Sequence, residues 1–207
     1  MTEARIEHGV GWSPGPGAYT AAGIGTLALA AWAAWSDLLL VVWGRVVPGW
    51  GVSGTVLVLA LVLWRTFLRA ARREETARLA WKRTRWLWPT SAVLIAVAAS
   101  GSAWGALDDL VSDARYYVLS PTGPGGCRAV VRETSFLVIG NGEAYAVGRT
   151  GLALGEADSW VVDDGYRPVA AGTYELKWDR SGGLLLINGT NVNPVVRGGQ
   201  ADIDCGW

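Results

Sequence analysis

The hydrophobic positions of this chain are concentrated in three long runs within its first half. The runs cover residues 18–43, 46–64 and 86–105, and the first contains one charged side chain, Asp37. A helix needs roughly 20 apolar residues to cross the hydrocarbon core of a bilayer. Tryptophans near the ends of the runs suit the headgroup region. The pattern therefore predicts three transmembrane helices; two spans behind a cleaved signal peptide, or a soluble α-rich domain, are the alternatives.

The segment that follows the third run, residues 106–115, has the sequence ALDDLVSDAR. A helix through it would place Leu107, Leu110 and Val111 on one face. Its three aspartates would then remain solvated. We expect this segment to be a helical stalk that holds the rest of the chain off the membrane surface.

Residues 116–207 contain short segments rich in β-branched and aromatic residues, separated by turn signals at intervals of roughly 8–12 residues. Asn141-Gly142 is the strongest hairpin signal, and Asp179–Gly183 and Asn188-Gly189 offer two more turns. Alternating side chains in Thr173–Trp178 are typical of a half-buried antiparallel sheet. The predicted fold class is an α + β membrane protein, with three transmembrane helices followed by a small antiparallel all-β sandwich or barrel.

The charges add up to zero, from 18 basic and 18 acidic side chains, but they are unevenly distributed. Residues 65–85 carry eight basic and two acidic side chains, whereas residues 106–207 carry eight basic and 13 acidic ones. Because basic loops beside membrane spans stay in the cytoplasm, residues 1–17 are expected there too. The region 18–105 would then cross the plasma membrane, and the stalk and residues 116–207 would lie outside the cytoplasm.

The basic loop predicts a second property, attraction to anionic lipid headgroups. A pure topology signal is the alternative, and nucleic-acid binding is not expected because so short a loop holds no folded module. The basic side chains are Arg65, Arg69, Arg72, Arg73, Arg78, Lys82, Arg83 and Arg85.

Cys127 and Cys205 are the only cysteines, and both lie in the exported part. Thiols outside the cytoplasm oxidise and persist as disulfides, so we predict a bridge that ties together the two ends of the β domain. The only histidine, His8, is expected in the cytoplasm. The exported domain therefore lacks the histidine of a catalytic triad or of a His-ligated metal site, and we predict no catalytic, metal or cofactor site.

Two further groups are candidate site residues. Asp163 and Asp164 in VVDDGYRP could form a cation or ligand loop, or an ordinary turn between strands. An ionisable group within a span is by default a hypothesis about function. Asp37 could pair with Arg45 across the first turn between spans, or could take part in transport or proton movement.

The segments GCRAVVRETSFLVIGNGEAYAV and DDGYRPVAAGTYELKW, with the overall layout and the bias toward Ala, Gly, Arg and Trp, resemble uncharacterised multi-pass membrane proteins of actinobacteria. The resemblance implies a cell-envelope protein and carries no functional motif. We expect a non-enzymatic module that binds or interacts with something in the envelope. One alternative is an accessory subunit of a transporter or envelope assembly, with a membrane-protein partner or a second copy. The other is a carboxylate-dependent exported enzyme.

Overall fold

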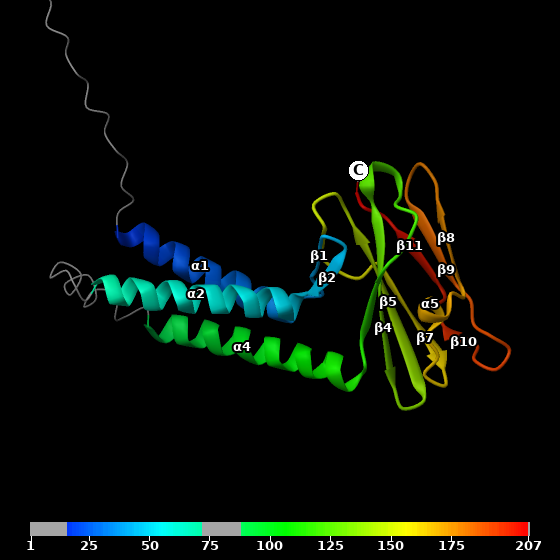
Figure 1. Cartoon of the computed structure of the whole chain (residues 1–207), viewed down its shortest axis with the longest axis horizontal. Helices are drawn as coiled ribbons and strands as arrows, with labels where there is room; N and C mark the ends of the chain where they lie inside the picture. The colour runs from blue at the N-terminus through cyan, green and yellow to red at the C-terminus, as the bar shows by residue number, and fades with distance from the viewer. Residues whose placement is uncertain (1–15, 72–87, 207) are drawn as a thin grey trace, which may run out of the picture.

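The computed structural model describes residues 16–71 and 88–206, which form three packed helices with a β domain at one end (Figure 1). The helices are α1 (Pro16–Trp35), α2 (Gly49–Ala71) and α4 (Trp88–Val111). Among the described residues, two helical segments are long and apolar enough to cross a membrane, Gly49–Thr66 and Trp88–Val111, while Ala22–Trp35 is a shorter apolar segment. The prediction of three such helices is therefore supported for the second and third runs only.

The last part of the first run is a strand and not a helix. After α1 ends at Trp35, β1 (Leu39–Val42) and β2 (Arg45–Pro48) form a hairpin, and β1 also pairs with β6 (Leu152–Ala153) of the β domain. Trp43 and Gly44 form its two-residue turn, with φ of 51° and 77°. Asp37 thus lies outside the helix in which the hydrophobic pattern placed it.

The helices pack through small residues. Ala30 of α1, Leu57 of α2 and Ala98 of α4 are buried at their common contact. Gly101 of α4 lies against Trp35 of α1, because a Cβ on this glycine would come within 2.6 Å of the indole Nε1. Close approach of this kind is typical of helices that associate in a membrane.

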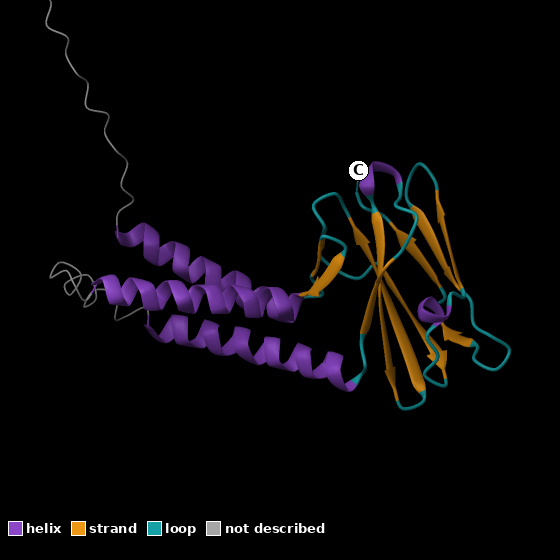
Figure 2. Ribbon diagram, in the orientation of Figure 1, coloured by secondary structure: helices purple, strands orange, loops and turns teal. Residues whose placement is uncertain are grey.

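The β domain consists of three antiparallel sheets (Figure 2). The central sheet has the order β10-β7-β5-β4-β3, and its two neighbours have the orders β11-β9-β8 and β2-β1-β6. The strands not yet given are β3 (Arg115–Val118), β4 (Arg128–Phe136), β5 (Ile139–Val147), β7 (Asp158–Asp163), β8 (Tyr174–Trp178), β9 (Gly183–Ile187), β10 (Val195–Arg197) and β11 (Gln200–Ile203). The short helices are η2 (Pro124–Gly126) and α5 (Pro168–Ala171).

The central sheet is buried on both faces. On β4, Val131 packs into a core with Leu185 and Ile203 of the β11-β9-β8 sheet. Val130, one residue earlier, points to the other face and packs with Leu39 of β1. The chain between α1 and α2 therefore supplies part of the core of the β domain, and the helices and the domain share packed side chains.

The segment predicted as a stalk has an unexpected orientation. α4 continues as far as Val111, so residues 106–111 are helical. However, Leu110 is 78% exposed, whereas the Asp109 side chain is only 13% exposed. The expectation that the three aspartates are solvated is therefore wrong for Asp109, which docks on the central sheet, whereas the side chains of Asp108 and Asp113 are 54 and 63% exposed. Because Asp108 and Asp109 pair with Arg132 of β4, the segment does not hold the β domain at a distance.

Turn signals in the sequence were informative in one case and misleading in another. A hairpin loop at Asp179–Gly182 connects β8 and β9, as predicted. Asn141-Gly142 instead lies within β5, and the β4–β5 turn is at Leu137-Val138. Gly142 is needed for packing, because a Cβ there would lie 2.1 Å from the indole of Trp160.

The predicted disulfide is confirmed. Cys127 and Cys205 are bonded, with 5.9 Å between their Cα atoms and 78 positions between them in sequence. Cys127 follows η2 and has no exposed surface. The bridge joins the start of β4 to the C-terminal segment after β11, and so links the central sheet to the β11-β9-β8 sheet.

Candidate binding cleft at the junction of helix and sheet

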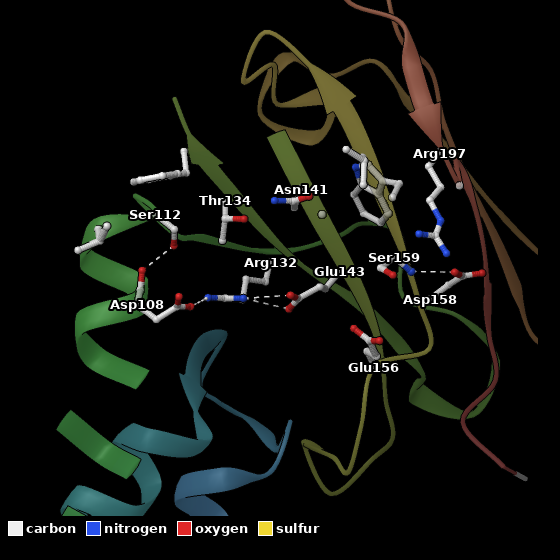
Figure 3. A pocket seen from close by; sticks show the side chains of 16 residues that line it. Asp108, Ser112, Arg132, Thr134, Asn141, Glu143, Glu156, Asp158, Ser159 and Arg197 are labelled. Carbon is white, nitrogen blue, oxygen red and sulfur yellow. Dashed lines mark hydrogen bonds and ion pairs between the residues drawn. The ribbon is translucent and has the colours of Figure 1, made fainter. Parts of the chain in front are cut away.

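A cleft of about 790 Å³ opens where the end of α4 meets the central sheet (Figure 3). Four carboxylates and two guanidinium groups line it, together with polar and apolar groups from β4, β5, β7 and β10. Its charged residues are Asp108, Arg132, Glu143, Glu156, Asp158 and Arg197. At neutral pH the lining therefore has an excess of two negative charges.

Arg132 of β4 is the centre of the ion-pair network on one side of this cleft. Its Nη2 lies 2.7 Å from Asp108 Oδ2 and 2.8 Å from Asp109 Oδ1, and its Nη1 lies 3.0 Å from Glu143 Oε1. Figure 3 shows the guanidinium extended between α4 and β5. Burial alone would lower the pKa of Arg132, but Glu143 and Asp109 raise it above its ordinary value. The side chain stays charged and holds α4 against the sheet.

Three aromatic side chains complete the network. Trp50 Nε1 and the Tyr116 hydroxyl donate to Asp109 Oδ2 at 2.8 and 2.9 Å, and the Tyr145 hydroxyl donates to Glu143 Oε2 at 2.8 Å. Burial and the neighbouring carboxylates raise the pKa of both tyrosines, so they remain donors at any physiological pH. Asp109 thus connects α2, α4 and the central sheet in one hydrogen-bonded group.

The opposite side of the cleft keeps its carboxylates available. Glu156 and Asp158 lie before and at the start of β7 and are exposed, and neither has an ion pair among the described residues. The Asp158 carboxylate accepts the backbone N–H of Ser159. Desolvation and then the negative charges of Glu143, Asp37 and Asp158 raise the pKa of Glu156. This repulsion is relieved when a cation binds or when Glu156 takes up a proton.

Trp160 adds an unsatisfied donor to the cleft wall. The residue is 2% exposed, and its indole N–H has no hydrogen-bond partner. Buried donors without a partner are rare, and each calls for an explanation. The indole lies on Gly142, which also lines the cleft.

The candidate residues from the sequence do not converge on one site. Asp163 and Asp164 are exposed at a tight turn in which Tyr166 N donates to Asp163 O, and they do not line the cleft. Asp37 and Arg45 are exposed too, on either side of β1, and no ion pair joins them.

The basic loop is described only at its beginning. Arg65 lies on α2 and is exposed. Arg69 lies near the end of the same helix. The other basic residues predicted to attract lipid lie outside the described residues: Arg72, Arg73, Arg78, Lys82, Arg83 and Arg85. His8 also lies outside them.

Sequence reasoning missed the cleft, although one signal was present. Arg132 and Glu133 directly follow the apolar segment Ala129–Val131 in the same strand, and charged residues in a buried strand need partners. Glu133 is 1% exposed, and its carboxylate accepts the backbone N–H groups of Val169 and Ala170 at 2.7 and 3.0 Å. The partners of both side chains are distant in sequence, so only the fold reveals them.

The fold and cleft define an α + β protein with antiparallel sheets, a helical bundle and an acidic groove. Within residues 16–71 and 88–206, no group of three or more His, Cys, Asp or Glu side chains is placed to hold a metal ion. Comparisons with protein-family models, curated proteins and solved structures gave no match.

Proposed function

We propose that this chain is an integral membrane protein that presents its β domain outside the cytoplasm, where the cleft binds a cationic group of an envelope partner without catalysis. Two apolar helices of sufficient length, the basic segment after α2 and the disulfide support this orientation. The N-terminus is then cytoplasmic and the location is the plasma membrane. The ligand class follows from the acidic cleft.

The proposal of a cationic ligand rests on how paired and unpaired charged side chains are distributed around the cleft. Arg132 is occupied by carboxylates, while Glu156 and Asp158 have no ion-pair partner among the described residues. Arg197 lines the cleft on the side of Asp158, and the lining as a whole still has an excess of two negative charges. An ammonium group beside these carboxylates would offset the negative charges that, after desolvation, raise the pKa of Glu156.

Binding of trilysine to the full chain in detergent tests this function. We expect Glu156→Gln combined with Asp158→Asn to weaken binding roughly 3- to 10-fold at low salt, as loss of two partly exposed ion pairs would do. Glu175→Gln is the matched control, because this exposed glutamate lies on β8 outside the cleft. Equal trilysine affinity in the parent protein, the double variant and the Glu175→Gln control would refute the proposed class of ligand.

Orientation in the membrane is tested separately with intact cells. Val192, 76% exposed in the loop before β10, is replaced by Cys and treated with a membrane-impermeant maleimide. Labelling without permeabilisation is expected. Labelling only after the cells are opened would place the β domain in the cytoplasm and refute the proposed topology.

A second function, that of an accessory subunit in a membrane assembly, is favoured by Trp43. This side chain is 99% exposed at the β1–β2 turn, where its φ of 51° is unusual for a bulky residue. A partner protein that covers the indole would bury a large apolar area. A photo-crosslinking residue at this position is expected to capture a membrane partner in cells, whereas crosslinks to lipid alone would count against a subunit.

A further inference from the structure

The β4–β5 hairpin ends in four consecutive large apolar side chains. Phe136, Leu137, Val138 and Ile139, called here the apolar tip, are 51, 84, 62 and 50% exposed. A hairpin turn in water ordinarily carries Gly, Asn or Asp, which tolerate positive φ and hydration. Leu137 instead adopts a φ of 56°. The exposure of four large apolar side chains is unfavourable in water, so this turn suits a less polar environment.

The apolar tip lies beside the end of α4. Ser135 N donates to Ser112 O at 2.8 Å, and Phe136 and Val111 line the same cleft. Figure 1 shows the end of the β4–β5 hairpin on the α4 side of the molecule, close to the end of that helix. On α4, Leu107, Leu110 and Val111 are 51, 78 and 56% exposed. The apolar surface of the helix thus continues onto the tip.

The length of α4 indicates which medium surrounds this surface. From Trp88 to Val111 the helix has 24 residues, about 36 Å at 1.5 Å per residue. The hydrocarbon core of a bilayer is about 30 Å thick, and the headgroup regions extend the total to about 40–45 Å. If the core begins at Trp88, then Leu110 and Val111 lie in the outer headgroup region. That region accommodates apolar and aromatic side chains whose neighbours are polar.

Of the two aspartates in the same helical turns, Asp109 is held by Arg132 on the sheet and its side chain is 13% exposed, while the side chain of Asp108 is 54% exposed. The exposed surface at the end of α4 and the tip therefore combines apolar side chains with nearby carboxylates. Such a mixture suits the headgroup region, where apolar and polar groups lie side by side, and not the hydrocarbon core.

We infer that the apolar tip and the end of α4 dock into the outer headgroup layer of the bilayer, so that the membrane forms a third support of the β domain beside the Arg132 network and the β1–β2 hairpin. This inference rests on the proposed membrane location. The lipid contact fixes the tilt of the β domain, and therefore the direction in which the cleft opens.

Lipid quenching in nanodiscs of phosphatidylcholine and phosphatidylglycerol tests the docking. In the full chain, Leu137→Cys is labelled with an environment-sensitive fluorophore; the native disulfide is retained because Cys127 is fully buried. Val97→Cys, on the exposed surface of α4, reports on the span. Val192→Cys, in the loop between β9 and β10 that is far from the helices in Figure 1, reports on water.

We expect spin-labelled lipid to quench the Leu137 label at least roughly twofold more than the Val192 label, with less quenching by iodide, as for an interfacial side chain. An iodide-accessible Leu137 label beside a lipid-quenched Val97 label would overturn the docking and leave the proposed function intact. A Val97 label that lipid does not quench would overturn both. Protection of the Leu137 label from both quenchers would show a protein contact, such as a second copy, and would also overturn the docking.

Discussion

Replacing Arg132 by Met removes the cation that joins α4 to the central sheet. Its side chain is 15% exposed, and it leaves behind Asp109 and Glu143, which are 13 and 27% exposed, and the more exposed Asp108. Removing one partner of a buried ion pair typically costs about 3–5 kcal/mol, because the remaining charge is left uncompensated. Water reaches two of these three carboxylates, so we expect a loss of about 3 kcal/mol in the free energy of unfolding.

Denaturant unfolding of the full chain in detergent measures this loss, with the variants Arg132→Met, Asp109→Asn and both together. Because the two side chains act in one network, the double variant is expected to lose clearly less than the sum of the single losses. Lys177→Met is the control, since Lys177 pairs with Glu175 on an exposed surface and its loss should leave the midpoint unchanged. Additive losses, or a loss for Arg132→Met no larger than the control, would refute the proposed joint.

Three further predictions concern the β domain. Gly142→Ala should lower the free energy of unfolding by about 1–3 kcal/mol because the added methyl meets the indole of Trp160, whereas Gly148→Ala, where a Cβ meets nothing within 4 Å, should be neutral. Cys205→Ser should lower the free energy of unfolding by about 2–5 kcal/mol, and the thiol of Cys127 should then react with maleimide after denaturation. Two reactive thiols in the denatured, unreduced parent protein would contradict the bridge. Burial, opposed by two backbone N–H donors, raises the pKa of Glu133 above its ordinary 4.5. The stability contributed by this group is present below that value and is lost as the pH rises through the raised pKa. The excess stability of the parent protein over Glu133→Gln should therefore shrink as the pH rises above 4.5, and a difference that stays constant with pH would exclude the pKa shift.

The sequence predicted the helices more accurately than it predicted their ends. An apolar run such as Leu38–Val42 suits the end of a helix as well as a buried strand, and periodicity alone does not separate the two. The segment forms a strand because it pairs with β6, which lies more than 100 positions later in the chain. The disulfide was predictable, because two cysteines leave a single intramolecular pairing.

The burial of Asp109 and the ion pairs of α4 were not predicted, for a related reason. Local patterns assign charged side chains to water unless a partner is known, and the partner of Asp108 and Asp109 lies on a strand more than 20 positions away. Once Arg132 is in place, α4 cannot turn about its axis without breaking these ion pairs. Arg132 and Asp108 also line the cleft. A movement of α4 that separates them would therefore leave the Asp108 carboxylate in the lining without its ion-pair partner. The ion pairs that pack α4 against the sheet and the carboxylates proposed to bind a cation, Glu156 and Asp158, therefore line one cleft.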